Sequence, residues 1–194
     1  MEKTKAWSKK VVLGLLAAVL ACTLGVTLVG CGASDEDKIK DAISTQLDLI
    51  KNHDEATIEE LEGSYASQFD QLGIDSGEFI NSWLDGFDYT IDSVTVDGEN
   101  ATADVTVTVK QLVPVLNEWQ PEYEAYVAEN AFTLDYSTAM EQAGTSFMEK
   151  LNAAETTSVT VTLPLQKDSS GNWILTSDSS TEFANALLGD TSAL

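Results

Sequence analysis

The sequence has 194 residues, of which 43% are hydrophobic and 8% aromatic. That is enough for one domain with a buried core and an N-terminal extension, and it excludes a wholly disordered chain. Ten basic residues stand against 32 acidic ones, for a formal net charge of −22, and all ten are lysines. Because binding to nucleic acid requires a basic surface, we expect no nucleic-acid partner.

A targeting segment precedes the domain. The first ten residues carry four lysines and one acid, and an uncharged, mostly apolar run follows from Val11 to Gly30. This order is typical of a secretory signal. The residues Leu28-Val29-Gly30-Cys31 resemble the bacterial lipobox, in which the cysteine is acylated and becomes the mature N-terminus. We therefore predict a signal peptide over 1–30, lipid attachment at Cys31 and a lipidated tether over 31–37.

Three other interpretations of the apolar run compete with this one. The run is about 20 residues long, which is sufficient for an uncleaved transmembrane anchor. Cleavage before Cys22 would use a poorer lipobox, because apolar residues follow it, and the basic flank argues against a buried helix. The lipoprotein and the anchor agree on topology: the lysines stay inside and the acidic domain lies outside. We expect a protein at the cell membrane with its domain on the extracytoplasmic side.

Helical spacing of apolar residues predicts three helices before residue 87. The first covers 35–52 and has Ser34 as its N-cap. Asp54 is expected to cap the second, which Gly63 bends or ends. Asp75, with Glu78 three residues later, resembles a capping box for a short third helix that ends at Gly86.

The apolar period then changes from 3.6 to 2, which predicts a β-hairpin over 87–109. Asp97-Gly98 is a turn signal, and a one-residue slip near Asp92 predicts a bulge. Residues 112–154 return to helical spacing. Pro114 and Pro121 are expected to break the first part of this stretch, so we predict two helical pieces rather than one rod.

A second hairpin, with its turn over 167–172, is expected to close the sheet, and Ser179 or Ser180 to cap a short last helix. Helices beside antiparallel hairpins indicate an α+β fold rather than a doubly wound α/β fold. We expect a curved antiparallel sheet of about four strands on N-terminal helices, with a helical insertion between the hairpins.

Two segments of the chain resemble small bacterial lipoproteins with an NTF2-like (cystatin-like) domain of unknown function. They are the hairpin over 86–103, which reads Gly-Phe-Asp-Tyr-Thr-Ile-Asp-Ser-Val-Thr-Val-Asp-Gly-Glu-Asn-Ala-Thr-Ala, and the closing Gly171-Asn172-Trp173. The resemblance implies an NTF2-like domain over 38–190, a sheet wrapped over helices and a cone-shaped hollow, and it implies no reaction.

Few residues offer catalytic or metal-binding chemistry. His53 is the single histidine and is expected on the surface. The run 168–172 is similar to a calcium loop but lacks the expected acid at Ser179, so we expect a plain turn. Four tyrosines, Tyr89, Tyr123, Tyr126 and Tyr136, are expected in the core.

We therefore expect no cofactor, no metal and no catalytic residue. The favoured function is a non-catalytic module that binds a small ligand or an envelope protein through the hollow or the outer face of the sheet. A hollow filled by Trp83, Trp119 and Phe147 would favour this binding or interaction module over an enzyme. The alternative is an isomerase-like enzyme that uses a Tyr/Asp pair in the hollow.

Overall fold

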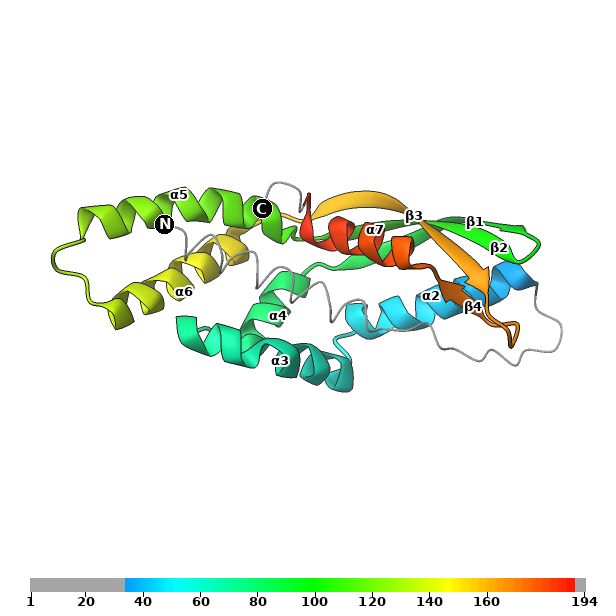
Figure 1. The fold of residues 1–194 in the computed structure, drawn as a ribbon, viewed down its shortest axis with the longest axis horizontal. Helices are drawn as coiled ribbons and strands as arrows, with labels where there is room; N and C mark the ends of the chain where they lie inside the picture. Colours follow the sequence, from blue (N-terminus) through cyan, green and yellow to red (C-terminus); the bar gives the residue numbers. More distant parts are fainter. Residues whose placement is uncertain (1–33, 191–194) are drawn as a thin grey trace.

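The computed structural model describes residues 34–190, apart from the side chains of residues 60, 63–68, 71, 177, 178, 180 and 181. The described elements, in chain order, are α2 (Asp35–Lys51), α3 (Glu55–Phe69), the 3-10 helix η1 (Asp70–Leu72), α4 (Ser76–Leu84), β1 (Asp88–Asp97), β2 (Asn100–Val109), α5 (Leu112–Glu129), α6 (Tyr136–Ala153), β3 (Thr157–Lys167), β4 (Trp173–Leu175) and α7 (Ser177–Leu188). Figure 1 shows an elongated molecule, with the turn of the β1–β2 hairpin near one end and the α5–α6 hairpin at the other.

The four strands form one antiparallel sheet in the order β1-β2-β3-β4, so each strand pairs with its neighbour in sequence. Asp97 pairs with Asn100, which leaves a two-residue turn at positions 98 and 99. The register of β1 shifts between Ile91 and Ser93, where the bulge was predicted. The α+β class and the antiparallel sheet, with helices before and between its strands, are confirmed.

The inner face of the sheet is filled by side chains. Ala103, Val105 and Val107 of β2 have no exposed surface, while the residues between them face outward. Helix α2 packs against β1, and α7 packs against β3. The centre of the sheet is therefore core, and β2 forms no open wall of the cone-shaped hollow that the NTF2-like resemblance implies.

The helical insertion consists of two helices, but the prolines do not separate them. Pro121 lies inside α5, which continues to Glu129, and the break falls in the loop before Asp135. Pro121 is exposed, whereas Trp119 and Tyr123 on the opposite side of the helix are buried. The packing of these two rings offsets the backbone hydrogen bond that proline removes.

Two smaller expectations concern helix ends. Helix α3 continues through Gly63 to Phe69, so Gly63 does not end it. The cap of the last helix is Thr176, not Ser179 or Ser180, because Thr176 is the residue with extended backbone before the helix. Ser179 is buried in the first turn, and its hydroxyl donates to the main-chain oxygen of Pro164.

A chain of aromatic rings runs through the helical part of the core. Phe69 packs on Phe79 at 4.4 Å between ring centroids, and Phe79 stacks on Phe147 at 6.2 Å. Trp119 meets Phe147 edge-on at 5.7 Å. The rings come from α3, α4, α6 and α5, so this chain joins the α5–α6 hairpin to the helices that precede the sheet.

Gly144 allows α6 to lie close enough for these contacts. A Cβ atom at this position would lie 2.1 Å from the main-chain oxygen of Leu72 and 3.0 Å from a side-chain carbon of Ile74. Because a backbone oxygen cannot rotate away as a side chain can, any larger residue must displace α6 from η1.

We therefore predict that Gly144→Ala lowers the free energy of unfolding by about 1–3 kcal/mol or more, despite the higher helix propensity of alanine. Chemical denaturation measures the change. Thr145→Ala is the matched control, because Thr145 is the next residue of α6 and is exposed. Equal stability of the Gly144→Ala protein and the unaltered protein would contradict the close approach of α6 to η1.

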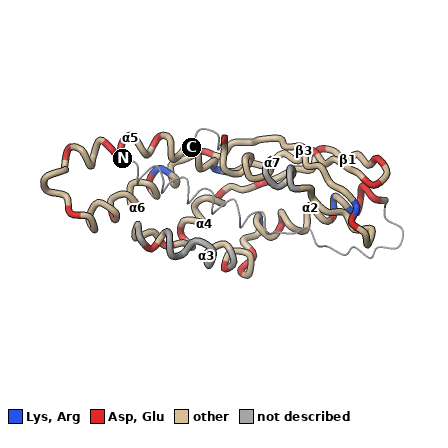
Figure 2. The backbone as a smooth tube through the Cα atoms, viewed as in Figure 1, with Lys and Arg blue, Asp and Glu red and all other residues tan. Residues whose placement is uncertain are grey.

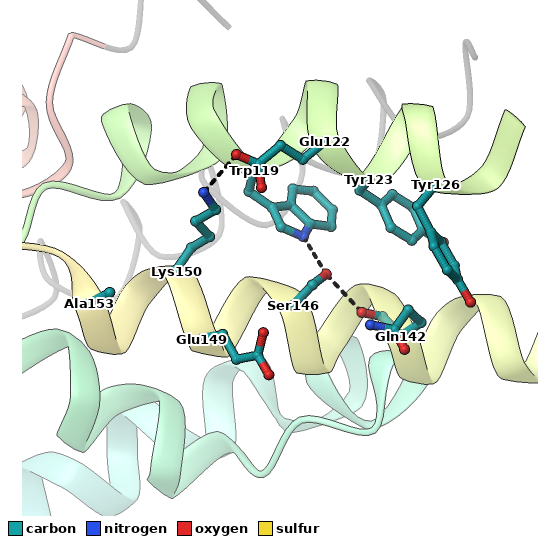
Figure 3. Close-up of a pocket in the computed structure, with 9 residues that line it drawn as sticks. All are labelled: Trp119, Glu122, Tyr123, Tyr126, Gln142, Ser146, Glu149, Lys150 and Ala153. Atoms are coloured by element: carbon teal, nitrogen blue, oxygen red, sulfur yellow. Dashed lines mark hydrogen bonds and ion pairs between the residues drawn. The ribbon is translucent and has the colours of Figure 1, made fainter. Parts of the chain in front are cut away.

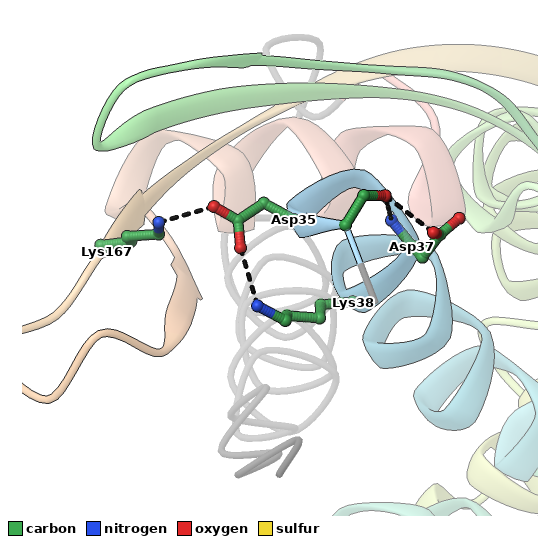
Figure 4. Close-up of polar contacts among 5 residues, drawn as sticks. Asp35, Asp37, Lys38 and Lys167 are labelled. Carbon is green, nitrogen blue, oxygen red and sulfur yellow. Dashed lines mark hydrogen bonds and ion pairs between the residues drawn. The ribbon is translucent and has the colours of Figure 1, made fainter. Parts of the chain in front are cut away.

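An ionic cluster ties the start of α2 to the β3–β4 hairpin (Figure 4). The carboxylate of Asp35 accepts from Lys167 at 2.6 Å and from Lys38 at 3.0 Å. The Lys167 ammonium also lies 4.9 Å from the ring centroid of Trp173, and its main-chain N–H donates to the oxygen of Glu99. The two hydrogen bonds from lysine lower the pKa of Asp35 to about 2.

This cluster predicts a specific loss of stability in acid. A carboxyl group with a pKa of about 2 in the folded state and an ordinary value of 3.8 in the unfolded state stabilises the fold fully above pH 4. That contribution falls as the pH decreases from about 4 to about 2. The difference in free energy of unfolding between the unaltered protein and Asp35→Asn should therefore be largest above pH 4 and shrink towards pH 2.

Denaturant titrations at several pH values measure this difference. Glu36→Gln is the control, because Glu36 is an exposed acid in the same helical turn and takes no part in the cluster. A constant difference between the Asp35→Asn protein and the unaltered protein from pH 5 to pH 2 would show that the cluster does not contribute.

Candidate functional site

A pocket of about 430 Å³ lies along the seam between α5 and α6 (Figure 3). Helix α5 contributes Trp119, Glu122, Tyr123 and Tyr126, and α6 contributes Gln142, Ser146, Glu149, Lys150 and Ala153. Spacings of three and four residues place each set on one side of its helix. The pocket therefore follows from the antiparallel pairing of two amphipathic helices.

The α5 wall of the pocket is aromatic. The rings of Trp119 and Tyr123 are stacked at 5.1 Å with an interplanar angle of 9°, and Tyr126 follows at 6.4 Å from Tyr123. Trp119 and Tyr123 are largely buried, while Tyr126 is half-buried and lies nearer the solvent. The wall offers a bound molecule ring surface rather than a row of polar groups.

The buried polar atoms of the pocket are paired within the protein. The indole N–H of Trp119 donates to the Ser146 hydroxyl at 2.9 Å, and that hydroxyl donates to the main-chain oxygen of Gln142. The Tyr123 hydroxyl donates to the main-chain oxygen of Ala139 at 2.7 Å. These groups hold the two helices in register and are engaged in structure, not poised as a reactive pair.

The rim of the pocket is charged. Lys150 and Glu122 form an ion pair across the seam at 2.7 Å, and this contact raises the pKa of Lys150 above its ordinary value. Glu149 is exposed at the same rim. Among the described residues, no ammonium group lies within ion-pair distance of Glu149. The pocket mouth therefore carries two carboxylates and one ammonium group.

The tyrosines named from the sequence lie in three different places. Tyr123 and Tyr126 line the pocket, and Tyr136 is exposed rather than in the core. The hydroxyl of Tyr89 donates to the Asp48 carboxylate at 2.7 Å, between β1 and α2. Burial raises the pKa of Tyr89, but Asp48 is exposed. This Tyr/Asp pair therefore lies at the surface, outside the pocket.

His53 and Asp168 have structural roles. His53 is exposed in the turn after α2, and its Nδ1 lies 3.0 Å from the side-chain oxygen of Asn81. One Asp168 oxygen accepts from the main-chain N–H groups of Ser170 and Asn172 at 2.8 Å, which closes the turn expected there. Among the side chains that the structure describes, no three from His, Cys, Asp or Glu cluster as a metal site would require.

Some predictions lie outside the described residues, namely the signal peptide over 1–30, Cys31 and Cys22. No helix within residues 34–190 combines the length and the apolar character needed to cross a bilayer. Trp83, Trp119 and Phe147 are buried, and they are part of the core rather than the filling of a separate hollow.

The pocket itself was not predicted from the sequence. Tyr123 and Tyr126 have the spacing of core residues. The one signal in the sequence that could have pointed to a shared rim is the opposite charge of Glu122 and Lys150, which pair across the two helices. A sequence does not show how closely two helices approach, and that distance decides whether a seam is closed or hollow.

Neither a family model nor a curated protein matches the chain. Among solved structures, one match is the protein YcdA of Bacillus subtilis subsp. subtilis str. 168, described as a candidate lipoprotein. It has 16% sequence identity and a TM-score of 0.38, and the match covers 77% of this chain and 48% of that chain. The chain thus spans about half the length of that structure, and a likeness at this score carries no argument about function.

Proposed function

We propose that the protein is a lipid-anchored binding module on the extracytoplasmic side of a bacterial cell membrane, with an NTF2-like domain. The lysine-rich start, the apolar run and Leu28-Val29-Gly30-Cys31 support the anchor. The four-stranded antiparallel sheet packed with helices supports the family resemblance. The α5–α6 pocket is the binding site.

One observation carries the choice of binding over catalysis. The pocket has an aromatic wall and a charged rim, but its buried polar atoms are already paired with the protein, and no Tyr/Asp pair faces it. An isomerase-like site would need an acid and a base aimed at one bound molecule. The Tyr89 and Asp48 groups lie elsewhere at the surface.

The lining of the α5–α6 pocket indicates the class of ligand. The aromatic rings of its α5 wall attract cations, and the carboxylate of Glu149 adds negative charge at the pocket mouth. The ligand is a small molecule, or a segment of an envelope protein, that has an apolar body and a positive charge.

Lipid attachment is tested by replacing the cysteine. Cys31→Ser should lose incorporation of labelled fatty acid and should keep the uncleaved N-terminal segment, because no thiol remains for acylation at the lipobox. Cys22→Ser is the matched control and should behave as the unaltered protein does. Mass spectrometry of membrane-extracted protein with an unmodified Cys31, or with the acyl group on Cys22, would contradict the proposal.

The binding site is tested with two charged probes of similar size, phenethylammonium and phenylacetate, added to the full-length protein. We expect millimolar affinity for phenethylammonium, as is usual for so small a molecule, and weaker binding of phenylacetate. Glu149→Gln should weaken the binding of the cation by roughly 3–5-fold, as one partly screened charge allows.

Glu141→Gln removes an equal charge from the same helix but lies outside the pocket lining, so it should leave the affinity unchanged. Calorimetric titration measures all four affinities. Equal binding of the two probes, or stronger binding of phenylacetate, would contradict a site for cations.

A further inference from the structure

The tip of the α5–α6 hairpin presents two aromatic side chains to solvent. Among the described residues, the large hydrophobic side chains that are fully or mostly exposed are Phe132, at 103%, and Tyr136, at 78%. Single exposed hydrophobic residues are common on protein surfaces. Here the two lie four residues apart at the tip of one hairpin, and the other large hydrophobic side chains that the structure describes are buried or half-buried.

The loop that carries Phe132 is held by hydrogen bonds. The main-chain N–H groups of Thr133 and Leu134 both donate to the oxygen of Asn130 at 3.0 Å. The side-chain amide of Asn130 donates to the main-chain oxygen of Tyr126 at 2.8 Å. The carboxylate of Asp135 accepts from the main-chain N–H of Thr138 and so caps the start of α6. A loop ordered in this way loses little conformational freedom when a partner binds its tip.

The tip lies at the far end of the molecule from the start of α2 (Figure 1). The beginning of α2, the β1–β2 turn and the β3–β4 hairpin share the opposite end, where Lys167 contacts both Asp35 and Glu99. With the proposed anchor at Cys31, four residues before Asp35, the tip points away from the membrane that holds the protein.

The surroundings of the tip are acidic. Residues 112–153 contain seven acidic residues and one lysine, and Figure 2 shows acidic positions along both helices. Lys150, the lysine, is already paired with Glu122. This field repels a second copy of the same chain and a membrane of anionic lipids, and it attracts a basic surface.

We propose that the tip of the α5–α6 hairpin, with Phe132 and Tyr136 at its centre, is a docking surface for a protein partner that offers an apolar socket within a basic surface. Aromatic side chains at the centre of an interface commonly supply most of its binding energy, and the surrounding charges set the rate of encounter. This inference goes beyond the proposed pocket site and rests on the proposed function only for the direction in which the tip points.

The test uses the full lipidated chain in nanodiscs of zwitterionic lipid, with empty nanodiscs as the blank. The probes are an amphipathic helical peptide of Lys and Leu and a peptide of equal charge made of Lys and Gly. We expect Phe132→Ser combined with Tyr136→Ser to weaken binding of the Lys/Leu peptide at least tenfold. Binding of the Lys/Gly peptide, which has no apolar side chains, should change little.

The acidic part of the surface is tested in the same assay. Glu129→Gln with Glu141→Gln should weaken binding of both peptides, while Glu36→Gln with Glu99→Gln removes two exposed charges at the other end and should not. Unchanged binding of the Lys/Leu peptide by the Phe132/Tyr136 variant would overturn the proposal. So would a dimer, or insertion into anionic vesicles, that depends on those two residues.

The same variants separate this proposal from the pocket site. Glu149→Gln should affect phenethylammonium and leave the Lys/Leu peptide unaffected, whereas the Phe132/Tyr136 variant should do the reverse. If Glu149→Gln leaves the binding of phenethylammonium unchanged, only the pocket proposal fails. If the Phe132/Tyr136 variant binds the Lys/Leu peptide as tightly as the unaltered protein does, only the tip proposal fails. Circular dichroism of each variant confirms that its helices are intact.

Discussion

The stacking of Phe147 in α6 on Phe79 in α4 is the contact on which the position of the α5–α6 hairpin depends. The strands before and after the hairpin fix only where its two ends enter and leave the sheet. The aromatic contact, together with the close approach at Gly144, sets the direction in which the hairpin extends. Trp119 then packs edge-on against Phe147, which places the aromatic wall of the pocket. The pocket and the tip are therefore consequences of one junction in the core.

The large negative charge is tolerated because many carboxylates have structural partners. Asp54, Asp75 and Asp135 each accept a main-chain N–H at the start of a helix, where the helix dipole also favours a negative group. On the outer face of the sheet, Asp104 accepts from the hydroxyls of Ser93 and Thr162, and these bonds lower its pKa. That face is thus a network of polar groups bonded to one another, which argues against its use as the binding surface. The acids of the α5–α6 hairpin are different, because only some of them have such partners.

The parts of the fold that were predicted correctly are those that neighbouring residues decide. The alternation in β1 and β2, the bulge near Asp92 and the cap at Asp75 depend on spacings of a few residues. The effect of Pro121 was predicted wrongly because it depends on which side of α5 is buried, and that is decided by α6, more than ten residues away along the chain. The pocket was not predicted either, because distant parts of the chain decide the burial of its residues. Spacing alone predicts a core position for both Tyr126 and Tyr136, yet Tyr126 lines the pocket and Tyr136 is exposed.

The proposed lipid anchor and the proposed binding sites belong to opposite ends of the molecule. The orientation of the domain at the membrane therefore determines what the sites can reach. Four residues of extended chain span at most about 14 Å, so a lipid at Cys31 would keep the start of α2 within that distance of its point of attachment. The bonds of Asp35 to Lys167 then hold the β3–β4 hairpin to the same end. With that anchor, rotation of the domain about so short a tether would be limited by collision with the bilayer. A long domain held in this way would present its opposite end, with the pocket along the seam of α5 and α6 and the aromatic tip beyond it, to molecules on the side away from the membrane.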